Sequence, residues 1–430
     1  DVCSSDLWCG ISVTDIEKLT DIFCSTAKIP LVAYTGLEYQ LSAIQNNRAI
    51  FVLWAITGKL DEPGAIYLNA KGLETPKLFE IPEDDKPIGV DEFPLFYKFS
   101  GLGQFSRFPK AVLEDEPYPV RGLMILGGSP VLSFPDSKSW REAYKKLDCL
   151  IVLDRYFTED ARYADVVFPA CSLFEVPKAV PGPEGPHIVE PLIEPVGESK
   201  NDVLIMGAIA KKLGFGDKLP QTEEELRSWL LSGTAPYAGD FGTSADQKKE
   251  KHYKKYETGE LRADGKPGFP TPSGKLEICS TILEENGFVP YPEYKDIRSI
   301  PELAGKEYPF TMTSGARSNN RMGVFGANLD KIAEIEPYPF VDINAEDAKE
   351  IGIEDGDMVK VITPFADGTF KAKIRGIARH AIHIPHGGGS AYMAEPWKNG
   401  NVNDLCSLDY ADPMTGFVLI KSVPCRVEKV

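Results

Sequence analysis

The stretch that decides the fold covers residues 123–175 and reads LMILGGSPVLSFPDSKSWREAYKKLDCLIVLDRYFTEDARYADVVFPACSLFE. Three near-continuous apolar runs, at residues 122–126, 149–153 and 165–169, are predicted to be strands. A helix is predicted between the second and third runs, over residues 158–164. Because strands buried on both faces have apolar residues throughout, this alternation indicates an α/β fold with a parallel sheet covered by helices.

The flanking sequence extends the same pattern. Upstream, residues 29–34 (IPLVAY) are predicted as a strand that ends at Thr35-Gly36 and leads into a helix over residues 38–60. Downstream, a helix is predicted over residues 201–213. We therefore expect part of a doubly wound parallel sheet domain over residues 29–215, preceded by an N-terminal remnant, residues 1–28, whose place in the fold is left open.

The remaining sequence predicts a connection and then a second domain. Residues 216–304 are rich in Pro and Gly and are interpreted as a connecting segment with short local elements. Residues 305–430 are predicted to form a small β-barrel of the double-psi type. Its strand candidates are residues 310–314, 340–343, 358–362, 369–374, 381–385 and 418–427, with a short helix over residues 346–351.

Composition excludes several classes of function. Of the 430 residues, 43% are hydrophobic, and the net charge of -17 is spread along the chain, so we expect no nucleic-acid partner. No apolar window approaches the roughly 18 residues that a membrane span needs, so no direct span is expected. No targeting signal can be read, and the localisation stays open between cytoplasm and periplasm.

Two patterns that suggest a metal site are interpreted otherwise. The eight cysteines form no C-x-x-C pair, so this chain by itself is not expected to hold an iron–sulfur cluster or zinc. His380, His383 and His386 are spaced three apart, and in a strand such residues point to opposite faces. We therefore expect no metal ligand among them.

Polar and glycine residues follow the predicted strands, where ligands of open parallel sheets bind. They are Gly36, then Gly127, Gly128 and Ser129, then Asp154 and Thr158, and finally Asp165. Glycines let a backbone approach a diphosphate, and a carboxylate accepts hydrogen bonds from ribose hydroxyls or from the N1–H and amino group of guanine. These residues predict a nucleotide site.

The order of these features resembles the molybdopterin oxidoreductase family, also called the dimethyl sulfoxide reductase superfamily. In that family a glycine-x-asparagine-proline turn precedes a strand ending in Asp, a Thr four places later, and an Ala-Asp-Val-Val-x-Pro strand. By this resemblance Asp154 and Thr158 take the guanosine-binding positions, Ser129 stands where the family has Asn, and Asp165 matches the Asp of the last strand.

The C-terminal sequence is similar to the dinucleotide-binding barrel of the same family. The matching segments are YPFTMTSGARSNN, FVDINAEDAKEIGIEDGDMVKVITP, HGGG and NVNDL. The resemblance, which covers about residues 29–430, implies that Ser314, Gly315 and Arg317 reach the pterin. It also implies that Asn403 contacts the pterin and that His386 is a hydrogen-bond donor beside the cofactor.

The resemblance implies a cofactor and a type of reaction. Family members bind a bis-molybdopterin guanine dinucleotide with molybdenum or tungsten and oxidise or reduce small-molecule substrates by two electrons or by oxygen-atom transfer. They pass electrons to a [4Fe-4S] cluster and, in some members, to an iron–sulfur electron-transfer subunit. The cluster and the metal ligand are expected upstream of this sequence, and the catalytic residues remain unknown.

Three alternatives stay open. A cofactor-free structural subunit, related to the large iron–sulfur subunit of respiratory complex I, would be marked by loss of the polar strand ends. A non-redox hydratase of the same superfamily would differ in the residues around the metal. An ordinary doubly wound dehydrogenase would need a G-x-G-x-x-G turn after a strand, which the sequence lacks.

Overall fold

The computed structural model describes residues 10–68, 86–180, 186–232, 252–315 and 329–430. The chain divides into two compact units, which we describe separately. Unit 1 comprises Asp1–Glu38, Ser42–Thr75 and Lys249–Tyr294, and unit 2 comprises Tyr39–Leu41, Pro76–Lys248 and Lys295–Val430. Within the described ranges, no helix has the length and apolar character needed to cross a bilayer.

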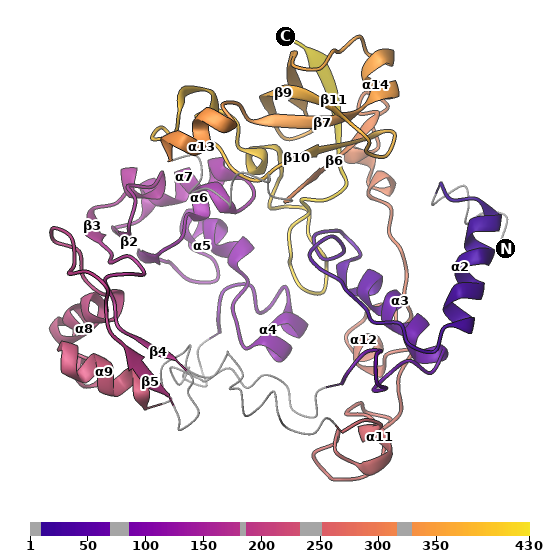
Figure 1. The fold of residues 1–430 in the computed structure, drawn as a ribbon, viewed down its shortest axis with the longest axis horizontal. Helices are drawn as coiled ribbons and strands as arrows, with labels where there is room; N and C mark the ends of the chain where they lie inside the picture. The colour runs from indigo at the N-terminus through magenta and orange to yellow at the C-terminus, as the bar shows by residue number, and fades with distance from the viewer. Residues whose placement is uncertain (1–9, 69–85, 181–185, 233–251, 316–328) are drawn as a thin grey trace. The chain divides into compact units, whose positions relative to one another are not determined.

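Unit 1 is mainly helical (Figure 1). Its helices are α2 (Val13–Ser25), α3 (Ala43–Ile56), α11 (Lys255–Thr258) and α12 (Thr281–Glu285). The strand predicted over residues 29–34 is wrong, because the segment joins no sheet and leaves Val32 94% and Tyr34 83% exposed. An apolar run alone does not make a strand when no neighbouring strand accepts its hydrogen bonds.

A buried ion pair joins two distant segments of unit 1. The ammonium of Lys255 donates to Asp61 Oδ1 at 2.5 Å, and the backbone N–H of Lys255 donates to Asp61 Oδ2 at 2.7 Å. Both side chains are withdrawn from water, with exposed fractions of 2% and 0%. The ammonium also donates to the carbonyl oxygen of His252 at 2.8 Å and lies 3.8 Å from the centre of the Tyr67 ring.

Unit 2 contains the predicted parallel sheet. Strands β1 (Gly122–Leu126), β2 (Cys149–Asp154) and β3 (Val166–Pro169) are all parallel, in the order β1-β2-β3. The helix predicted over residues 158–164 is only a 3-10 turn, Asp160–Arg162. The other elements of this part are α4 (Pro94–Ser100), α5 (Phe108–Glu114), α6 (Pro130–Ser133), α7 (Ser137–Lys146), α8 (Asp202–Lys212), α9 (Glu223–Leu231) and the antiparallel pair β4 (Lys178–Val180) and β5 (His187–Val189).

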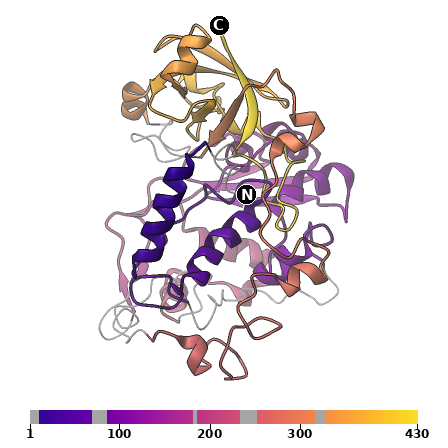
Figure 2. The same ribbon diagram turned by 90° about the vertical axis from the view of Figure 1, so that its right-hand side faces the viewer.

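The C-terminal part of unit 2 is a closed six-stranded barrel, as predicted (Figures 1 and 2). The strand order is β10-β6-β11-β8-β9-β7. The strands are β6 (Phe310–Ser314), β7 (Phe340–Asn344), β8 (Met358–Ile362), β9 (Asp367–Arg375), β10 (Ala381–Ile384) and β11 (Val423–Lys429), and the helices are α13 (Asp330–Ile335) and α14 (Ala345–Glu350). Alternate apolar side chains, including Met312, Val359 and Ile382, fill its core.

A second apolar core lies where the loop after β10 packs against the sheet. Met393 and Trp397 from this loop join Ile125, Leu132 and Trp140 in one buried cluster. The loop and the sheet thus share a core, which fixes the ends of β1 and β2 relative to the barrel.

Candidate functional site

The three parallel strands bring the expected polar residues to one edge of the sheet. Gly127 follows β1 with φ of 59°, and its N–H donates to the carbonyl oxygen of Leu153 in β2 at 2.9 Å. Asp154 ends β2, and Cys171 lies just beyond β3. This C-terminal edge is where ligands of open α/β sheets bind.

Ser129 is engaged by a residue that the sequence did not single out. Its hydroxyl donates to Asp160 Oδ2, while the Tyr144 hydroxyl and the Val131 N–H donate to Asp160 Oδ1 at 2.8 Å and 3.1 Å. Asp160 is fully buried, and burial raises the pKa of its carboxyl. Asp160 therefore fixes the turn that contains Gly127, Gly128 and Ser129.

Asp154 has an acidic neighbour at the same edge. Asp154 Oδ1 accepts the N–H of Tyr156 at 3.0 Å, and burial raises the pKa of its carboxyl. Asp202, the first residue of α8, also has a pKa raised by burial and then by the charge of Asp154. The half-buried Thr158 accepts the N–H of Ala161 at 3.2 Å. Two carboxylates within electrostatic reach of one another offer acceptors to a base with two neighbouring N–H donors.

A hollow of about 310 Å³ opens beside these acids. Residues after β2, residues after β3 and the first turn of α8 line it. The lining residues are Arg155, Cys171, Ser172, Leu173, Val176, Asn201, Asp202 and Val203. It combines one basic residue, one acid and a helix N-terminus, and such helix ends favour anionic groups of ligands.

Asp165 lies away from this edge. It precedes β3, its Oδ2 accepts the N–H of Leu150 at 2.7 Å, and its own N–H donates to the carbonyl oxygen of Leu150 at 2.8 Å. Leu150 is four residues before Asp154 in β2, which places Asp165 roughly 13 Å along the sheet toward its opposite edge. The expectation that Asp165 lies with the other strand-end residues is therefore corrected, because Asp165 comes just before the first residue of β3.

The barrel residues gather at one end of the barrel. The pairing of Ile384 with Ser314 brings the ends of β10 and β6 together, so Gly315 and His386 lie at the same mouth. Ser314 is buried, and its hydroxyl donates to the carbonyl oxygen of Ile420 at 3.3 Å. His386 is half-buried. Arg317 lies outside the described residues.

Close packing explains why glycines follow His386. Gly388 and Gly389 have φ of 94°, and a Cβ on Gly388 would lie 2.6 Å from the carbonyl oxygen of Gly400. Asn403, which follows this contact, is buried and donates from Nδ2 to the carbonyl oxygen of Leu132 at 2.7 Å. Asn403 therefore ties the barrel loop to α6, a contact that the sequence did not predict.

Gly36 belongs to unit 1, where it lies in a turn after residues 28–34. The expectation that Gly36 follows a strand is therefore corrected, because those residues form none.

Glu175, beyond β3, accepts the N–H of Ser172 at 2.5 Å and that of Val196 at 2.6 Å. Hydrogen bonds from the Ser172 side chain and backbone, and then from the Val196 N–H, lower the pKa of Glu175 to about 2. Glu175 thus holds together the loops beside the hollow.

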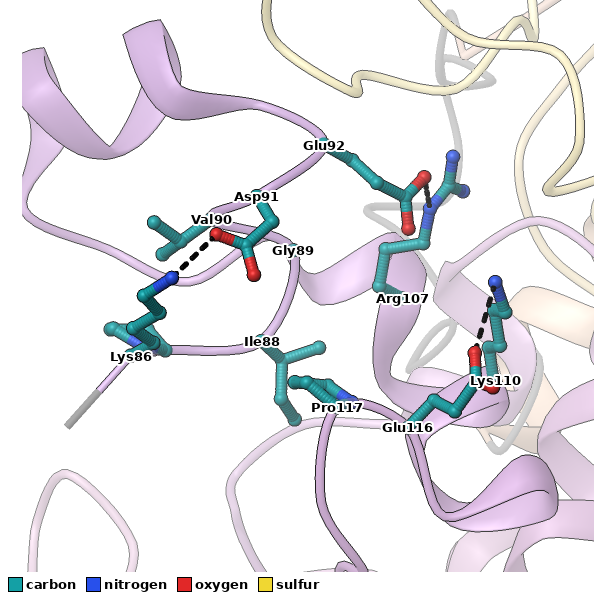
Figure 3. A pocket seen from close by; sticks show the side chains of 11 residues that line it. Lys86, Ile88, Gly89, Val90, Asp91, Glu92, Arg107, Lys110, Glu116 and Pro117 are labelled. Atoms are coloured by element: carbon teal, nitrogen blue, oxygen red, sulfur yellow. Dashed lines mark hydrogen bonds and ion pairs between the residues drawn. The ribbon is translucent and has the colours of Figure 1, made fainter.

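A second hollow, of about 170 Å³, contains none of the expected site residues. Figure 3 shows that its charged side chains pair with one another: Lys86 with Asp91 at 3.0 Å, Arg107 with Glu92 at 2.7 Å, and Lys110 with Glu116 at 3.8 Å. Arg107 also donates to the carbonyl oxygen of Leu408 at 3.2 Å. Because these charges are already satisfied, we assign the hollow no ligand.

The histidine series forms no cluster. His383 Nδ1 lies 2.9 Å from Asp342 Oδ2 within the barrel, whereas His380 has a φ of 57° and lies outside the strand. Across the described ranges, no group of three or more His, Cys, Asp or Glu side chains could hold a metal ion.

Three residues of interest escaped sequence reasoning: Asp160, Asp202 and the buried Lys421. Asp202 resembles an ordinary helix-start acid, and Asp160 is half of an acidic pair with Glu159. A signal existed for Lys421, because it interrupts the apolar run FVLIKSV near the C-terminus. A charge within a buried run indicates a special environment.

Comparison with known proteins agrees with this arrangement. The family described as "Molybdopterin oxidoreductase" matches residues 38–212, and the "Molydopterin dinucleotide binding domain" matches residues 311–424. The chain belongs to the molybdopterin oxidoreductase family. The second match includes Ser314, His386 and Asn403 and most of the barrel.

Relatives in this family include enzymes of several named activities. The chain is 28% identical to "Probable oxidoreductase YoaE" of Bacillus subtilis over 82% of this chain and 50% of the relative. It is 29% identical to the "F420-dependent formate dehydrogenase subunit alpha" of Methanocaldococcus jannaschii over 88% of this chain and 56% of that relative. The chain spans about half the length of these relatives.

The solved structure of acetylene hydratase from Pelobacter acetylenicus has the same fold. Its TM-score is 0.78, and the match covers 98% of this chain and 63% of that one at 22% sequence identity. At this identity the likeness concerns the fold alone.

Proposed function

We propose that this chain is the cofactor-binding part of a molybdenum- or tungsten-dependent oxidoreductase that holds a bis-molybdopterin guanine dinucleotide. The observation that carries the proposal is the position of two acids: Asp154 ends β2, and Asp202 begins α8 and lines the hollow beyond the strand ends. Their oxygens would accept the guanine N1–H and amino group or the ribose hydroxyls. The glycine turn fixed by Asp160 would accommodate the dinucleotide backbone, with Ser314, Gly315 and Asn403 on the barrel side.

When bound, the metal with its thiolate ligands supplies two-electron redox or oxygen-atom-transfer chemistry on a small substrate. The residues of this chain would bind and orient the cofactor and shield it from water. Two relatives, the formate dehydrogenase subunit alpha and an assimilatory nitrate reductase catalytic subunit, are named as subunits of enzymes. By analogy we propose an iron–sulfur electron-transfer partner.

A hydratase is the second candidate, because acetylene hydratase of Syntrophotalea acetylenica is 25% identical over 88% of this chain and 56% of the hydratase. The two candidates share the dinucleotide site, so this site supports both. They differ in whether turnover consumes electrons. A reduced viologen dye would be reoxidised by an oxidoreductase in the presence of its oxidising substrate, whereas a hydratase would leave it reduced.

The cofactor itself is tested on the full-length protein. Acid release followed by fluorescence and nucleotide chromatography is expected to yield oxidised pterin and GMP in equal amounts, and metal analysis is expected to find molybdenum or tungsten. Protein that folds yet releases neither pterin nor guanine nucleotide would contradict the proposal and favour a cofactor-free scaffold.

A further inference from the structure

Lys421 lies at the mouth of the barrel, two residues before β11, and only 9% of its surface is exposed. The pairing of Val423 with Met312 brings it beside the end of β6. There its ammonium donates to the carbonyl oxygen of Ser314. This acceptor is neutral, whereas an ammonium carries a full charge and three donors. The contact therefore leaves most of the charge uncompensated.

No carboxylate compensates this charge within the described ranges, where Lys421 forms no ion pair. Burial lowers the pKa of Lys421, as expected when an ammonium loses water without gaining an anion. Lys255 in unit 1 shows the usual alternative, because that buried ammonium contacts the carboxylate of Asp61. A buried cation without an anion is costly, which suggests that a ligand supplies the anion.

The backbone around Lys421 is shaped to hold the ammonium in place. Ser422 has a φ of 62°, a left-handed conformation that costs a non-glycine residue free energy. Gly315 has a φ of 102°, and a Cβ there would lie 2.9 Å from the Lys421 ammonium nitrogen. Backbone strain of this kind is concentrated at ligand sites, where binding offsets it.

We propose that Lys421 binds a phosphate of the pterin guanine dinucleotide at the barrel mouth, beside Ser314 and Gly315. This inference rests on the proposed function and assigns one further residue to the same site. A phosphate is favoured over the thiolate sulfurs because those sulfurs share their charge with the metal, whereas phosphate oxygens keep theirs for hydrogen-bond donors. An exposed glycine backbone at the end of β6 also lets a ligand approach closely.

The test compares the full-length wild-type protein with Lys421→Met, Lys421→Arg and a control, Lys429→Met. Lys429 ends β11, the strand that follows Lys421, but its ammonium is exposed and pairs with Asp357 at 2.7 Å. Bound pterin and GMP per chain are expected to fall on the order of tenfold or more in Lys421→Met, less in Lys421→Arg, and not at all in the control. Unchanged occupancy in Lys421→Met would overturn the inference.

A second measurement separates binding from a structural role. Protein from a host that cannot make the pterin is compared by its melting temperature. Because the uncompensated charge is removed, cofactor-free Lys421→Met is expected to melt at the same temperature as the wild type or higher. A melting point several degrees lower would show that Lys421 is structural and would overturn the inference.

Two further measurements distinguish failure of the phosphate assignment from failure of the proposed function. In the fraction of Lys421→Arg that retains cofactor, the EPR spectrum of the half-reduced metal should match the wild type, since a phosphate contact is remote from the metal. A shifted spectrum would overturn the phosphate assignment. If the wild-type protein itself held no pterin or guanine nucleotide, the proposed function would fail, independently of Lys421.

Discussion

Asp154 ends β2 and Asp202 begins α8, and they lie near enough that the charge of Asp154 adds to burial in raising the pKa of the Asp202 carboxyl. Two acids that repel one another are relieved when a ligand brings N–H donors between them. The two acids are brought near each other only by folding, because Asp154 ends β2 and Asp202 begins α8. This relationship makes the pair a testable base-recognition site.

We expect Asp154→Asn and Asp202→Asn each to reduce bound dinucleotide on the order of tenfold, because each loses a charged acceptor. If both acids serve one base, the double variant should lose less than the sum of the two free energies. GMP released per chain measures the effect. The control is Asp217→Asn, an exposed acid beyond α8. Full retention of GMP in both single variants would exclude this site.

Removal of the Asp160 carboxylate should destabilise unit 2. In Asp160→Ala three donors, from Ser129, Tyr144 and Val131, lose their acceptor in a buried place. We expect the free energy of unfolding to fall by about 2–4 kcal/mol, against about 1 kcal/mol for Tyr144→Phe. Urea denaturation measures both. The exposed Asp148→Ala should change it by less than about 0.5 kcal/mol, and an equally small change in Asp160→Ala would refute the role.

Glu175 should make stability depend on acid pH. Its folded pKa of about 2 is below the ordinary 4.5, so its stabilising effect is present above pH 4.5 and is lost as the pH falls toward 2. We expect Glu175→Gln to melt at a lower temperature than the wild type at pH 7, with the difference shrinking between pH 4.5 and 2. Melting curves across this range check it. A difference independent of pH would show that the charge contributes nothing.

The contributions of Asp61 and Lys255, the buried ion pair of unit 1, to stability should be coupled. Lys255→Met leaves the carboxylate of Asp61 buried without its cation, and we expect the unfolding free energy to fall by about 3–5 kcal/mol. The double variant Asp61→Asn/Lys255→Met should be more stable than Lys255→Met alone, because no buried charge remains. Additive losses in a double-mutant cycle would indicate that the two side chains are not coupled.

The sequence predicted the sheet and barrel strands well, because both leave a local pattern. Cys149–Asp154 in the sheet is a near-continuous apolar run, whereas Met358–Ile362 in the barrel alternates fully buried residues with less buried ones. It failed at residues 29–34, where the apolar run is equally clear but no neighbouring strand pairs with it. It also predicted the last strand too early, because Ser422 bends the chain before β11. Strand pairing and backbone bends are set by distant contacts.

From the sequence, site residues could be predicted only where they occupy positions of a family motif. Asp154 and Ser129 could be found by their place after apolar runs. The roles of Asp160 and Asp202 arise from neighbours brought close by folding, so no local pattern distinguishes them from ordinary surface acids. For Asp165 the motif was misleading. Its motif position suggested a ligand contact, yet its carboxylate accepts a backbone N–H of the neighbouring strand.

The order of strands in the barrel has a consequence for its synthesis. Strand β11 lies between β6 and β8, and Phe310 pairs with Cys425 across almost the whole length of the domain. During translation, β6 and β8 therefore present open edges until the last strand has left the ribosome. Such edges are templates for wrong pairing, and late long-range closure is slow. Closure of this barrel thus waits for β11, the strand that joins β6 to β8.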